Sequence, residues 1–154
     1  MKILMVCLGN ICRSPIAEGV LQKKACDAGL DWQIDSAGTN RYHTGEAPHH
    51  FSQKVCLQHG IDISGQCART FTAKDFQQYD IIYALAMDVY GEIEKVSDSK
   101  TQMHKVKLFL SELEEGNTES VPDPWYGDES GYLPVYQLIE RTCTAIISKY
   151  YTPR

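Results

Sequence analysis

The sequence predicts an α/β protein in which a doubly wound sheet of four parallel strands carries helices on both faces. Short apolar segments with the length of buried strands alternate along the chain with longer segments of helical periodicity. This alternation is typical of a parallel sheet that is covered on each side by helices. With 154 residues, of which 43% are hydrophobic, the chain is long enough to bury a core, and residues 1–154 are expected to form a single domain.

The first forty residues are predicted to form a strand, a helix and a second strand. Residues 2–6 are mostly apolar and precede a turn-forming Gly-Asn pair, as expected for a short buried strand. A helix is predicted to open at Ser14 and Pro15, with Ser14 near the N-cap, because proline is tolerated in the first turn. Its apolar residues recur at the spacing of one helical face, and Gly29 ends it. Residues 33–37 are predicted as the second strand.

The middle of the chain is predicted to hold two helices and the clearest strand. After a loop over residues 38–48, residues 48–59 have a helical pattern that ends at a glycine. Residues 72–78 are predicted as a short helix with Thr72 as its cap. Residues 79–86, "YDIIYALA", form the clearest buried strand, because seven of the eight positions carry aliphatic or aromatic side chains.

The last part of the chain is predicted to hold a helix over residues 88–96, the fourth strand over 105–110 and a closing amphipathic helix over 133–151. Strands and helices in this order give a Rossmann-like arrangement. A long loop over residues 111–131 has no predicted structure, and such a loop inside a compact domain is usually functional. The side chains of the closing helix that are predicted to face inward are Val135, Leu138, Ile139, Thr142, Ile146 and Tyr150.

Composition and charge argue against several classes of protein. The formal net charge is −5, whereas nucleic-acid-binding domains need a basic face, so no nucleic-acid partner is expected. No segment approaches the roughly 20 apolar residues of a membrane-spanning helix. The apolar start is shorter than the core of a signal peptide, so we expect a cytoplasmic protein. A monomer is the simplest expectation for the oligomeric state.

Six cysteines and five histidines are scattered along the chain without the spacing of a metal site. Most of the cysteines are expected to be small buried residues in a reducing compartment, although Cys7 and Cys12 stand apart because of their neighbours. We expect no metal and no cofactor. The histidines are expected to lie at the surface, with none of them against Cys7. They are His43, His49, His50, His59 and His104.

Residues 7–14, "CLGNICRS", lie where the first strand ends and the first helix begins. In an open parallel sheet, ligands bind beyond the carboxyl ends of the strands. The helix that follows supplies unpaired N–H groups and the positive end of its dipole, which favour an anion. Gly9 and Asn10 tolerate positive φ, so that successive N–H groups can converge on one ligand. The stretch therefore predicts a phosphate-binding loop.

The side chains of this loop match covalent phosphoryl transfer. Cys7 lies in the field of the helix N-terminus, so it is expected to ionise readily and to act as the nucleophile. Arg13 can form two hydrogen bonds to a tetrahedral anion, and Ser14 can donate its hydroxyl to the thiolate. Leu8 and Ile11 are expected to present backbone N–H groups to phosphate while their side chains help to line the pocket.

Other interpretations of the loop are less well supported. A nucleotide-binding phosphate loop needs the lysine of Gly-x-x-x-x-Gly-Lys-[Ser/Thr], which is absent, and a dinucleotide-binding loop needs three glycines. Cys7 and Cys12 as metal ligands would need two further ligands at credible spacing. The remaining alternative is a buried cysteine near an exposed arginine, with no chemical role.

Residues 7–15, "CLGNICRSP", resemble the signature loop of the low-molecular-weight protein tyrosine phosphatases. Three further segments follow in the order of that family: "DSAGT" (35–39), "AMD" (86–88) and "DPWYGD" (123–128). The resemblance covers essentially the whole chain. It implies hydrolysis of phosphotyrosine, with acid phosphatase activity, through a phosphocysteine on Cys7, with Arg13 stabilising the transition state. It also implies tyrosine-phosphorylated proteins as partners, and phosphate, sulfate or vanadate as active-site anions.

Asp123 is the predicted general acid and base, because a phenolate leaving group needs a proton and the later attack of water needs a base. Pro122 and Pro124 stiffen its backbone, and its aromatic neighbours offer an apolar setting that favours the protonated acid. The general acid of the family matches this residue. Asp128 is the alternative acid, and a mildly acidic, bell-shaped pH profile is expected.

Aromatic residues in two loops are predicted to form the pocket walls. Trp125 and Tyr126 are interpreted as one wall of a slot for an aryl phosphate; the alternative is that they anchor a long loop. Tyr42 matches a rim position that varies in the family and influences substrate choice. Ile11 stands where the related protein-arginine phosphatases carry threonine, and an apolar residue there fits a phenyl ring better than a guanidinium. Phosphotyrosine is therefore preferred, with phosphoarginine as the alternative.

Further roles follow from the resemblance. Ser36 is expected to hydrogen-bond to Asn10 and hold the loop, the alternative being a serine that caps a turn. Cys12 resembles a second cysteine that pairs reversibly with Cys7 under oxidation, since a neighbouring thiol rescues a sulfenic acid as a disulfide. Its alternative role is that of a small pocket residue. Asp88 is a candidate for bracing the loop, without an assigned partner.

Three other functions fit the sequence less well. The thioredoxin-coupled arsenate reductases share the scaffold, but they need a further cysteine pair after the third strand, and residues 87–105 contain no cysteine. Cys56 and Cys67 precede that strand and are poor substitutes. A phosphate-dependent binding module has no use for the proton donor in "DPWYGD". Cysteine proteolysis needs a histidine partner for Cys7.

Overall fold

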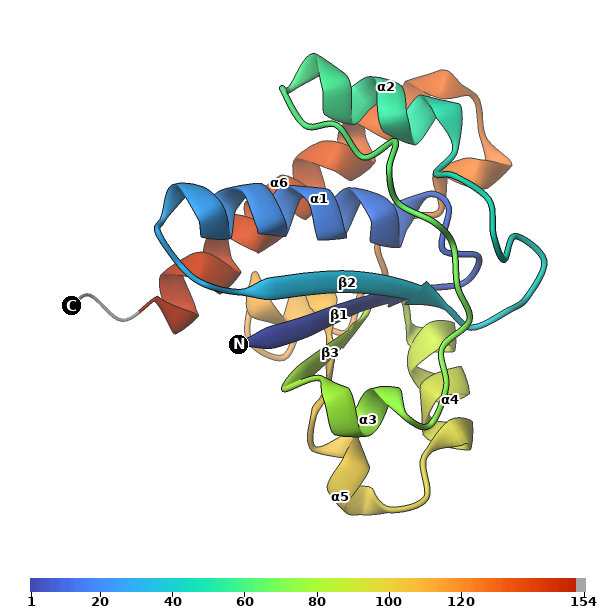
Figure 1. Ribbon diagram of the computed structural model, residues 1–154, viewed down its shortest axis with the longest axis vertical. Coiled ribbons are helices and arrows are strands. Elements are labelled where there is room, and N and C mark those ends of the chain that lie inside the picture. Colours follow the sequence, from blue (N-terminus) through green and yellow to red (C-terminus); the bar gives the residue numbers. More distant parts are fainter. Residues whose placement is uncertain (152–154) are drawn as a thin grey trace.

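The computed structural model describes residues 1–151 and contains a four-stranded sheet with helices packed against it (Figure 1). The strands lie in the order β2-β1-β3-β4, and every neighbouring pair is parallel. The predicted fold class, a doubly wound sheet of four parallel strands, is therefore confirmed. The strands are β1 (Lys2–Cys7), β2 (Gln33–Gly38), β3 (Ile81–Ala84) and β4 (Val106–Leu108).

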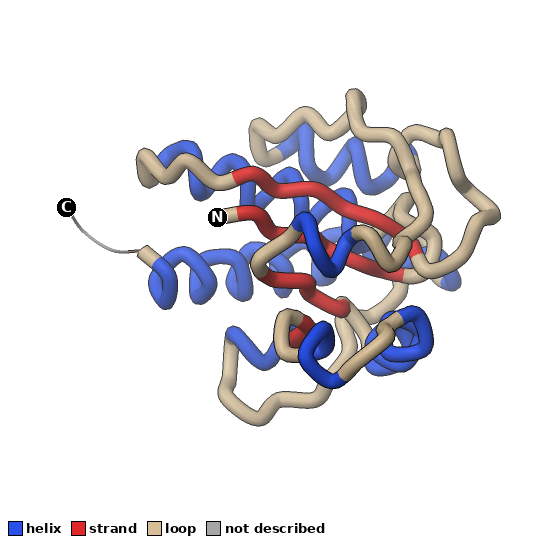
Figure 2. Tube along the Cα trace, turned by 60° about the horizontal axis from the view of Figure 1, so that its bottom comes forward, coloured by secondary structure: helices blue, strands red, loops and turns tan. Residues whose placement is uncertain are grey.

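Helices cover both faces of the sheet, as Figure 2 shows. Successive side chains of a strand point to opposite faces, so Ile3 and Met5 of β1 enter one core while Leu4 and Val6 enter the other. The first core is closed by α1 (Arg13–Asp27), α2 (His50–Gln58) and α6 (Tyr132–Tyr150). The second is closed by α3 (Asp75–Gln78), α4 (Met87–Val96) and α5 (Lys100–Met103).

Both later strands are shorter than predicted. β3 pairs only with residues 3–6 of β1 and with β4, so its ladder ends at Ala84, although the flanking Leu85 and Ala86 are also buried. Phe109 and Leu110, predicted to extend β4, begin a 3-10 helix (Phe109–Glu112) instead. The apolar pattern therefore predicts which residues are buried, and buried residues continue past the hydrogen-bonded part of each strand.

Two helices start later than predicted, and a third was not predicted. α2 begins at His50, later than predicted. α3 begins only at Asp75, and Thr72 is not its cap, because the Asp75 carboxylate accepts the Thr72 N–H at 2.9 Å and forms the turn before the helix. α5 is absent from the sequence prediction, although Ser99 caps it by accepting the N–H of Gln102 at 3.4 Å.

The segment over residues 111–131, predicted to lack structure, folds locally. It contains the 3-10 helices Pro124–Tyr126 and Glu129–Gly131. Asp123 caps the first by accepting the backbone N–H of Trp125 at 3.0 Å, and Asp128 caps the second through the N–H of Ser130 at 3.1 Å. Aspartates commonly make such side-chain bonds two residues on, and here they give the long connection two ordered turns.

The closing helix α6 packs against the first core. Four of its six predicted inward residues are buried, whereas Leu138 and Tyr150 are only half-buried. Three buried residues are absent from the prediction, two of them tyrosines. The full set of buried side chains is Tyr132, Val135, Tyr136, Ile139, Thr142, Cys143 and Ile146.

No helix within residues 1–151 is both long enough and apolar enough to cross a membrane. The assignment of residues 1–154 to one domain stays a prediction, and its last three residues lie outside the described part of the chain.

Candidate active site

A cavity of about 250 Å³ opens at the carboxyl ends of the strands. Three segments meet there: the loop between β1 and α1, the loop after β2, and the segment that precedes α6. In Figure 1 they lie on the right-hand side, where the arrows of β1 and β2 end. The residues that line the cavity are Cys7, Leu8, Gly9, Ile11, Cys12, Arg13, Asn40, Tyr42, His43, Asp123, Trp125 and Tyr126.

Cys7 is the last residue of β1 and is almost fully buried. Its Sγ lies 3.0 Å from Oγ of Ser14. Ser14 lies near the N-cap of α1, as predicted; the N-cap itself is Cys12, which makes no side-chain cap hydrogen bond. The Ser14 hydroxyl is turned back beneath the loop toward the sulfur, and Ser14 is not among the residues that line the cavity. A role of Ser14 in substrate binding stays a prediction.

The backbone of the loop is used asymmetrically. Three of its carbonyl groups accept backbone N–H groups of other segments: Cys7 O accepts the N–H of Thr39 at 3.0 Å, Leu8 O that of Asn40 at 3.0 Å, and Ile11 O that of His49 at 2.8 Å. By contrast, the N–H groups of residues 8–12 donate to no protein acceptor within residues 1–151. Buried N–H groups normally have partners, so this set of donors at the N-terminus of α1 is suited to an anion.

Asn10 holds the loop in shape. It is the one non-glycine residue with positive φ in the described chain, at 58°, and it is buried beneath the loop rather than in the cavity lining. Its Nδ2 donates to Ser14 Oγ at 2.8 Å and to Ser36 Oγ at 2.9 Å, so the hydrogen bond expected between Asn10 and Ser36 is present. Gly38 is required beside it, because a Cβ there would lie 2.9 Å from the carbonyl oxygen of Leu8.

Arg13, the first residue of α1, is 4% exposed. Its Nη1 donates to the carbonyl oxygen of Val121 at 3.0 Å, and its Nη2 lies 3.4 Å from Oδ2 of Asp123. Both partners belong to the segment before α6, so the guanidinium joins that segment to the loop. A planar guanidinium held in this way can bind two oxygens of one tetrahedral anion.

The two candidate acids have different surroundings. Asp123 lines the cavity, and its side chain is 21% exposed. Asp128 lies outside the lining and is exposed. Hydrogen bonds from the hydroxyl and the backbone N–H of Ser130 lower the pKa of Asp128, which favours the carboxylate and disfavours a proton donor. The geometry therefore favours Asp123 over the alternative acid.

Aromatic side chains form the mouth of the cavity. Trp125 is 47% exposed, Tyr126 is 79% exposed, and Tyr42 on the opposite loop is 87% exposed. The Trp125 ring contacts the rings of His43 and His49 edge to face, at 5.5 Å between centroids in each case. These rings give the mouth apolar faces on which a planar group can pack.

Two lining residues are absent from the sequence prediction, Asn40 and His43. The expectation that all histidines lie at the surface is wrong for His43 and His49, which are half-buried. His43 Nδ1 lies 2.7 Å from a carboxylate oxygen of Glu46, and the ring stands against Gly9, where a Cβ would come within 3.0 Å of it. Its position next to Tyr42 in the sequence was the signal that could have found it.

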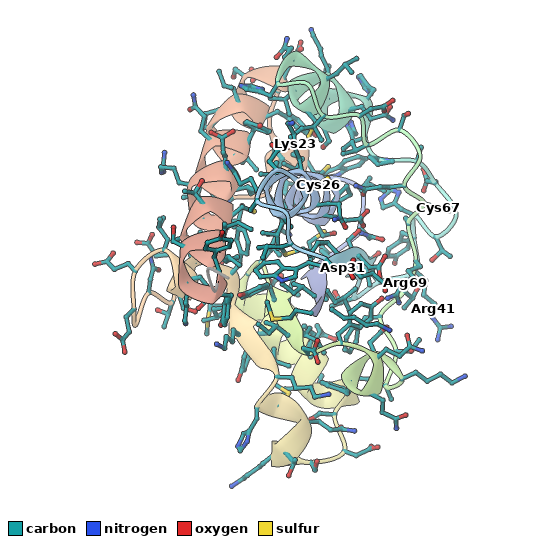
Figure 3. The ribbon with its side chains drawn as sticks, turned by 60° about the vertical axis from the view of Figure 1, so that its left-hand side comes forward. Lys23, Cys26, Asp31, Arg41, Cys67 and Arg69 are labelled. Atoms are coloured by element: carbon teal, nitrogen blue, oxygen red, sulfur yellow. The ribbon has the colours of Figure 1, made fainter. Side chains whose placement is uncertain are left out.

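The surroundings of Cys12 differ from those of Cys7, although both cysteines are buried and neither forms a disulfide bond. Burial raises the pKa of Cys12 to about 11, with the Tyr132 hydroxyl 3.6 Å from its sulfur acting against this rise. Two other cysteines, Cys26 and Cys67, are exposed and lie outside the cavity lining, on separate elements (Figure 3). Pairing of Cys7 with Cys12 under oxidation stays a prediction.

Two further expectations can be compared with the structure. Asp88 is exposed in the first turn of α4, and no hydrogen bond to the loop is recorded for it within residues 1–151. In the same residues, no three His, Cys, Asp or Glu side chains come together as a metal site requires. A reaction without metal or cofactor stays a prediction.

Comparisons with known proteins identify the family of this chain. The family model for low molecular weight phosphotyrosine protein phosphatase matches residues 2–151. The human low molecular weight phosphotyrosine protein phosphatase is 37% identical over 151 residues, covering 96% of this chain and 94% of that protein. A protein tyrosine phosphatase from Entamoeba histolytica, solved with Hepes in its active site, has a TM-score of 0.90 at 35% identity, covering 97% and 96% of the two chains. The Drosophila arginine phosphatase has a TM-score of 0.90 at 30% identity and covers 100% of both chains.

Proposed function

This chain belongs to the low molecular weight phosphotyrosine protein phosphatase family, and on that premise we propose that it hydrolyses phosphotyrosine through a phosphocysteine intermediate on Cys7. The members of this family are protein-tyrosine phosphatases, so the chain is a hydrolase that acts on phosphoproteins. One observation carries the mechanism. Cys7, Arg13 and Asp123 line a single cavity beside a set of backbone N–H groups without protein acceptors in the described chain.

In the first step the Cys7 thiolate attacks phosphorus, and a P–S bond forms as the P–O bond to the phenol breaks. Ser14 Oγ, 3.0 Å from the sulfur, can donate to the thiolate before the attack. Asp123 gives its proton to the departing oxygen, because a phenolate leaves poorly without one. Arg13 and the N–H groups of residues 8–12 bind the non-bridging oxygens and stabilise the charge of the transition state.

In the second step water attacks the phosphocysteine. Asp123, left as a carboxylate by the first step, takes a proton from that water as the new P–O bond forms. The P–S bond breaks, phosphate is released and Cys7 leaves as a thiolate. One carboxyl group therefore serves both steps, first as an acid and then as a base, so a bell-shaped pH profile is expected.

The walls of the cavity favour an aryl phosphate. Ile11 is an apolar lining residue, and Trp125 and Tyr126 present aromatic faces to a phenyl ring. A guanidinium would need hydrogen-bond acceptors, and Asp123 is the one carboxylate in this lining. The similarity to the Drosophila arginine phosphatase makes phosphoarginine the second candidate substrate.

The proposal is tested by phosphate release from peptides of one sequence that carry phosphotyrosine, phosphoarginine or phosphoserine, in the presence of EDTA. We expect hydrolysis of the phosphotyrosine peptide, inhibition by vanadate, and a kcat/KM at least about tenfold above that for phosphoarginine. Cys7→Ser should lower kcat by about 10⁴-fold or more while vanadate still binds. Cys26→Ser, at an exposed cysteine outside the cavity, is the matched control.

Two outcomes would change the proposal. Activity of the Cys7→Ser variant close to that of the unmodified chain would overturn the phosphocysteine mechanism. A preference for phosphoarginine would leave the mechanism and change the substrate class. A cytoplasmic location, a monomeric state and sulfate or phosphate as bound anions stay predictions from the sequence.

A further inference from the structure

A continuous chain of hydrogen bonds runs from Cys7 to a carboxylate on α1 that lies outside the cavity lining. Ser14 Oγ lies 3.0 Å from Cys7 Sγ and accepts from Asn10 Nδ2 at 2.8 Å. The same Nδ2 donates to Ser36 Oγ at 2.9 Å, and Ser36 Oγ donates to Glu18 Oε1 at 2.6 Å. Every link is short, and Glu18 ends the chain.

The donors and acceptors of this chain have one consistent direction. The backbone N–H of Arg69 donates to Asn10 Oδ1 at 3.0 Å, which fixes the orientation of the Asn10 amide and turns its two N–H bonds toward the serines. Each serine oxygen therefore accepts from Asn10 and must use its own hydrogen elsewhere. Ser36 gives its hydrogen to Glu18, and Ser14 gives its hydrogen to the sulfur of Cys7.

We propose that Glu18 is a positioning residue for the nucleophile: as the last acceptor of the chain, it orients the Ser36 hydroxyl and thereby keeps Asn10 and Ser14 aligned, with Ser14 as a donor to Cys7. This inference rests on the proposed function, because only a thiolate nucleophile benefits from such a donor. Glu18 acts through the other groups and does not touch the substrate.

The surroundings of the chain explain why a terminal acceptor matters. Asn10 is buried in a left-handed conformation that is unfavourable for most residues, so its side-chain bonds stabilise the loop. Glu18 follows Ser14 by four residues, so one side of α1 carries both the donor to the sulfur and the terminal acceptor. Arg69, labelled in Figure 3, belongs to the segment between α2 and α3, which bridges to the end of β2 at Gly38.

The charged groups around Glu18 also bear on its protonation. Burial raises the pKa of Glu18 to about 7; the carboxylate of Asp35 acts in the same direction, against the hydrogen bond from Ser36 and the positive charge of Arg69. Either form of the carboxyl group retains an oxygen that can accept from Ser36. The proposal is therefore that the acceptor matters more than the charge, which makes glutamine the conservative replacement.

The test compares Glu18→Ala with Glu18→Gln by the rate at which iodoacetate alkylates Cys7, located by peptide mass spectrometry. At pH 5 we expect Glu18→Ala to slow alkylation about five- to tenfold, because the Cys7 thiolate then loses about one hydrogen bond, the one from Ser14. A smaller effect is expected at pH 8. Glu18→Gln should stay within about twofold of the unmodified chain. Glu140→Ala is the matched control, because Glu140 also accepts a hydroxyl hydrogen, from Tyr136, but belongs to α6.

Ser36→Ala separates positioning from packing. It cuts the chain between Asn10 and Glu18, so it should slow alkylation about as much as Glu18→Ala does, and the double variant should be no slower than either. Additive losses, or Glu18→Gln behaving like Glu18→Ala, would overturn the proposal. If Glu18→Ala does not fold, as judged by its thermal melting curve, the pair Ser36→Ala and Glu18→Gln still decides the question.

Alkylation needs no phosphate ester, so this result is independent of whether the chain hydrolyses phosphotyrosine. A Cys7 that reacts equally fast in every variant would overturn the role of Glu18 and leave the proposed function standing. Loss of hydrolysis without any change in alkylation of the Glu18 variants would likewise assign the loss to another step.

Discussion

The two segments that supply the reacting groups are held in opposite ways. The loop over residues 7–14 is largely buried, and the Asn10 side chain within it forms hydrogen bonds to α1, to β2 and to the segment between α2 and α3. The segment over residues 123–126 is largely exposed, and its bonds are mostly local, such as that from the Trp125 N–H to Asp123. Arg13 is the side chain that connects them, through Val121 and Asp123.

This difference matches two tasks of a phosphatase, which are to bind the phosphate group and to accept the peptide around it. The phosphate group is the same in every substrate, so a rigid buried loop with all its polar side chains satisfied can recognise it. The peptide around a phosphotyrosine varies, and exposed aromatic residues can accept it without a fixed network. A substitution in the loop is expected to disturb the hydrogen-bonded partners of the altered residue as well. A substitution in the exposed segment is expected to affect mainly the contacts of the altered side chain.

Within this comparison of the two segments, the largest effect is expected at Asp123, the residue of the exposed segment that has a proposed chemical role. Asp123→Asn should lower kcat for phosphotyrosine about 10²- to 10³-fold, because no proton is then supplied to the leaving group. Alkylation of Cys7 by iodoacetate should change less than about threefold, since Asp123 is not part of the network beneath the loop. Steady-state kinetics and the alkylation rate measure the two quantities. An unchanged kcat would transfer the role of general acid to Asp128.

The next effect concerns the buried network and is a change in stability rather than in rate. The pKa of Glu18 is raised from 4.5 to about 7 in the folded chain, so the folded state binds more protons than the unfolded state between those pH values. The contribution of Glu18 to stability therefore falls as pH rises from about 4.5 to 7. Glu18→Gln removes this dependence and should gain roughly 2–3 kcal/mol relative to the unmodified chain over that range.

Urea unfolding of both proteins at several pH values measures this difference, because the other carboxyl groups are common to the two chains. A constant difference between the two stability curves from pH 4.5 to 8 would contradict the raised pKa of Glu18. Alkylation of Cys7 serves as the control, since the glutamine variant is expected to keep the loop aligned.

The smallest expected effect comes from the exposed aromatic wall. Trp125→Ala removes one ring face that is already 47% exposed, so it should raise KM for phosphotyrosine peptides about three- to tenfold, or about 1 kcal/mol. The backbone N–H that Asp123 accepts remains, so kcat should stay within about twofold. A fall of kcat by more than tenfold would show that the ring also positions Asp123, and the two segments would then be less different than proposed.

Much of the fold and part of the site follow from contiguous sequence. Residues 7–15 combine the end of a buried strand, a Gly-Asn turn and a helix start, and these preferences act over a few residues. Such short-range information predicted the parallel sheet, the loop and the cavity residues Cys7, Arg13 and Asp123. It also over-extended β3, because an apolar pattern reports burial rather than the length of a hydrogen-bonded ladder.

The remaining features depend on which segments pack together. Asn10 is held by Ser36, 26 residues away, and by the backbone of Arg69, 59 residues away, and His43 reaches the cavity only because Gly9 leaves room for its ring. The sequence alone determined that a tight loop leading into a helix would follow the first strand. Only the tertiary structure decided that Ser36 and Glu18 continue the hydrogen-bond network beneath the loop and that the Arg69 backbone orients Asn10, because hydrogen bonds between distant segments exist only once β2 and its neighbours have packed around the loop.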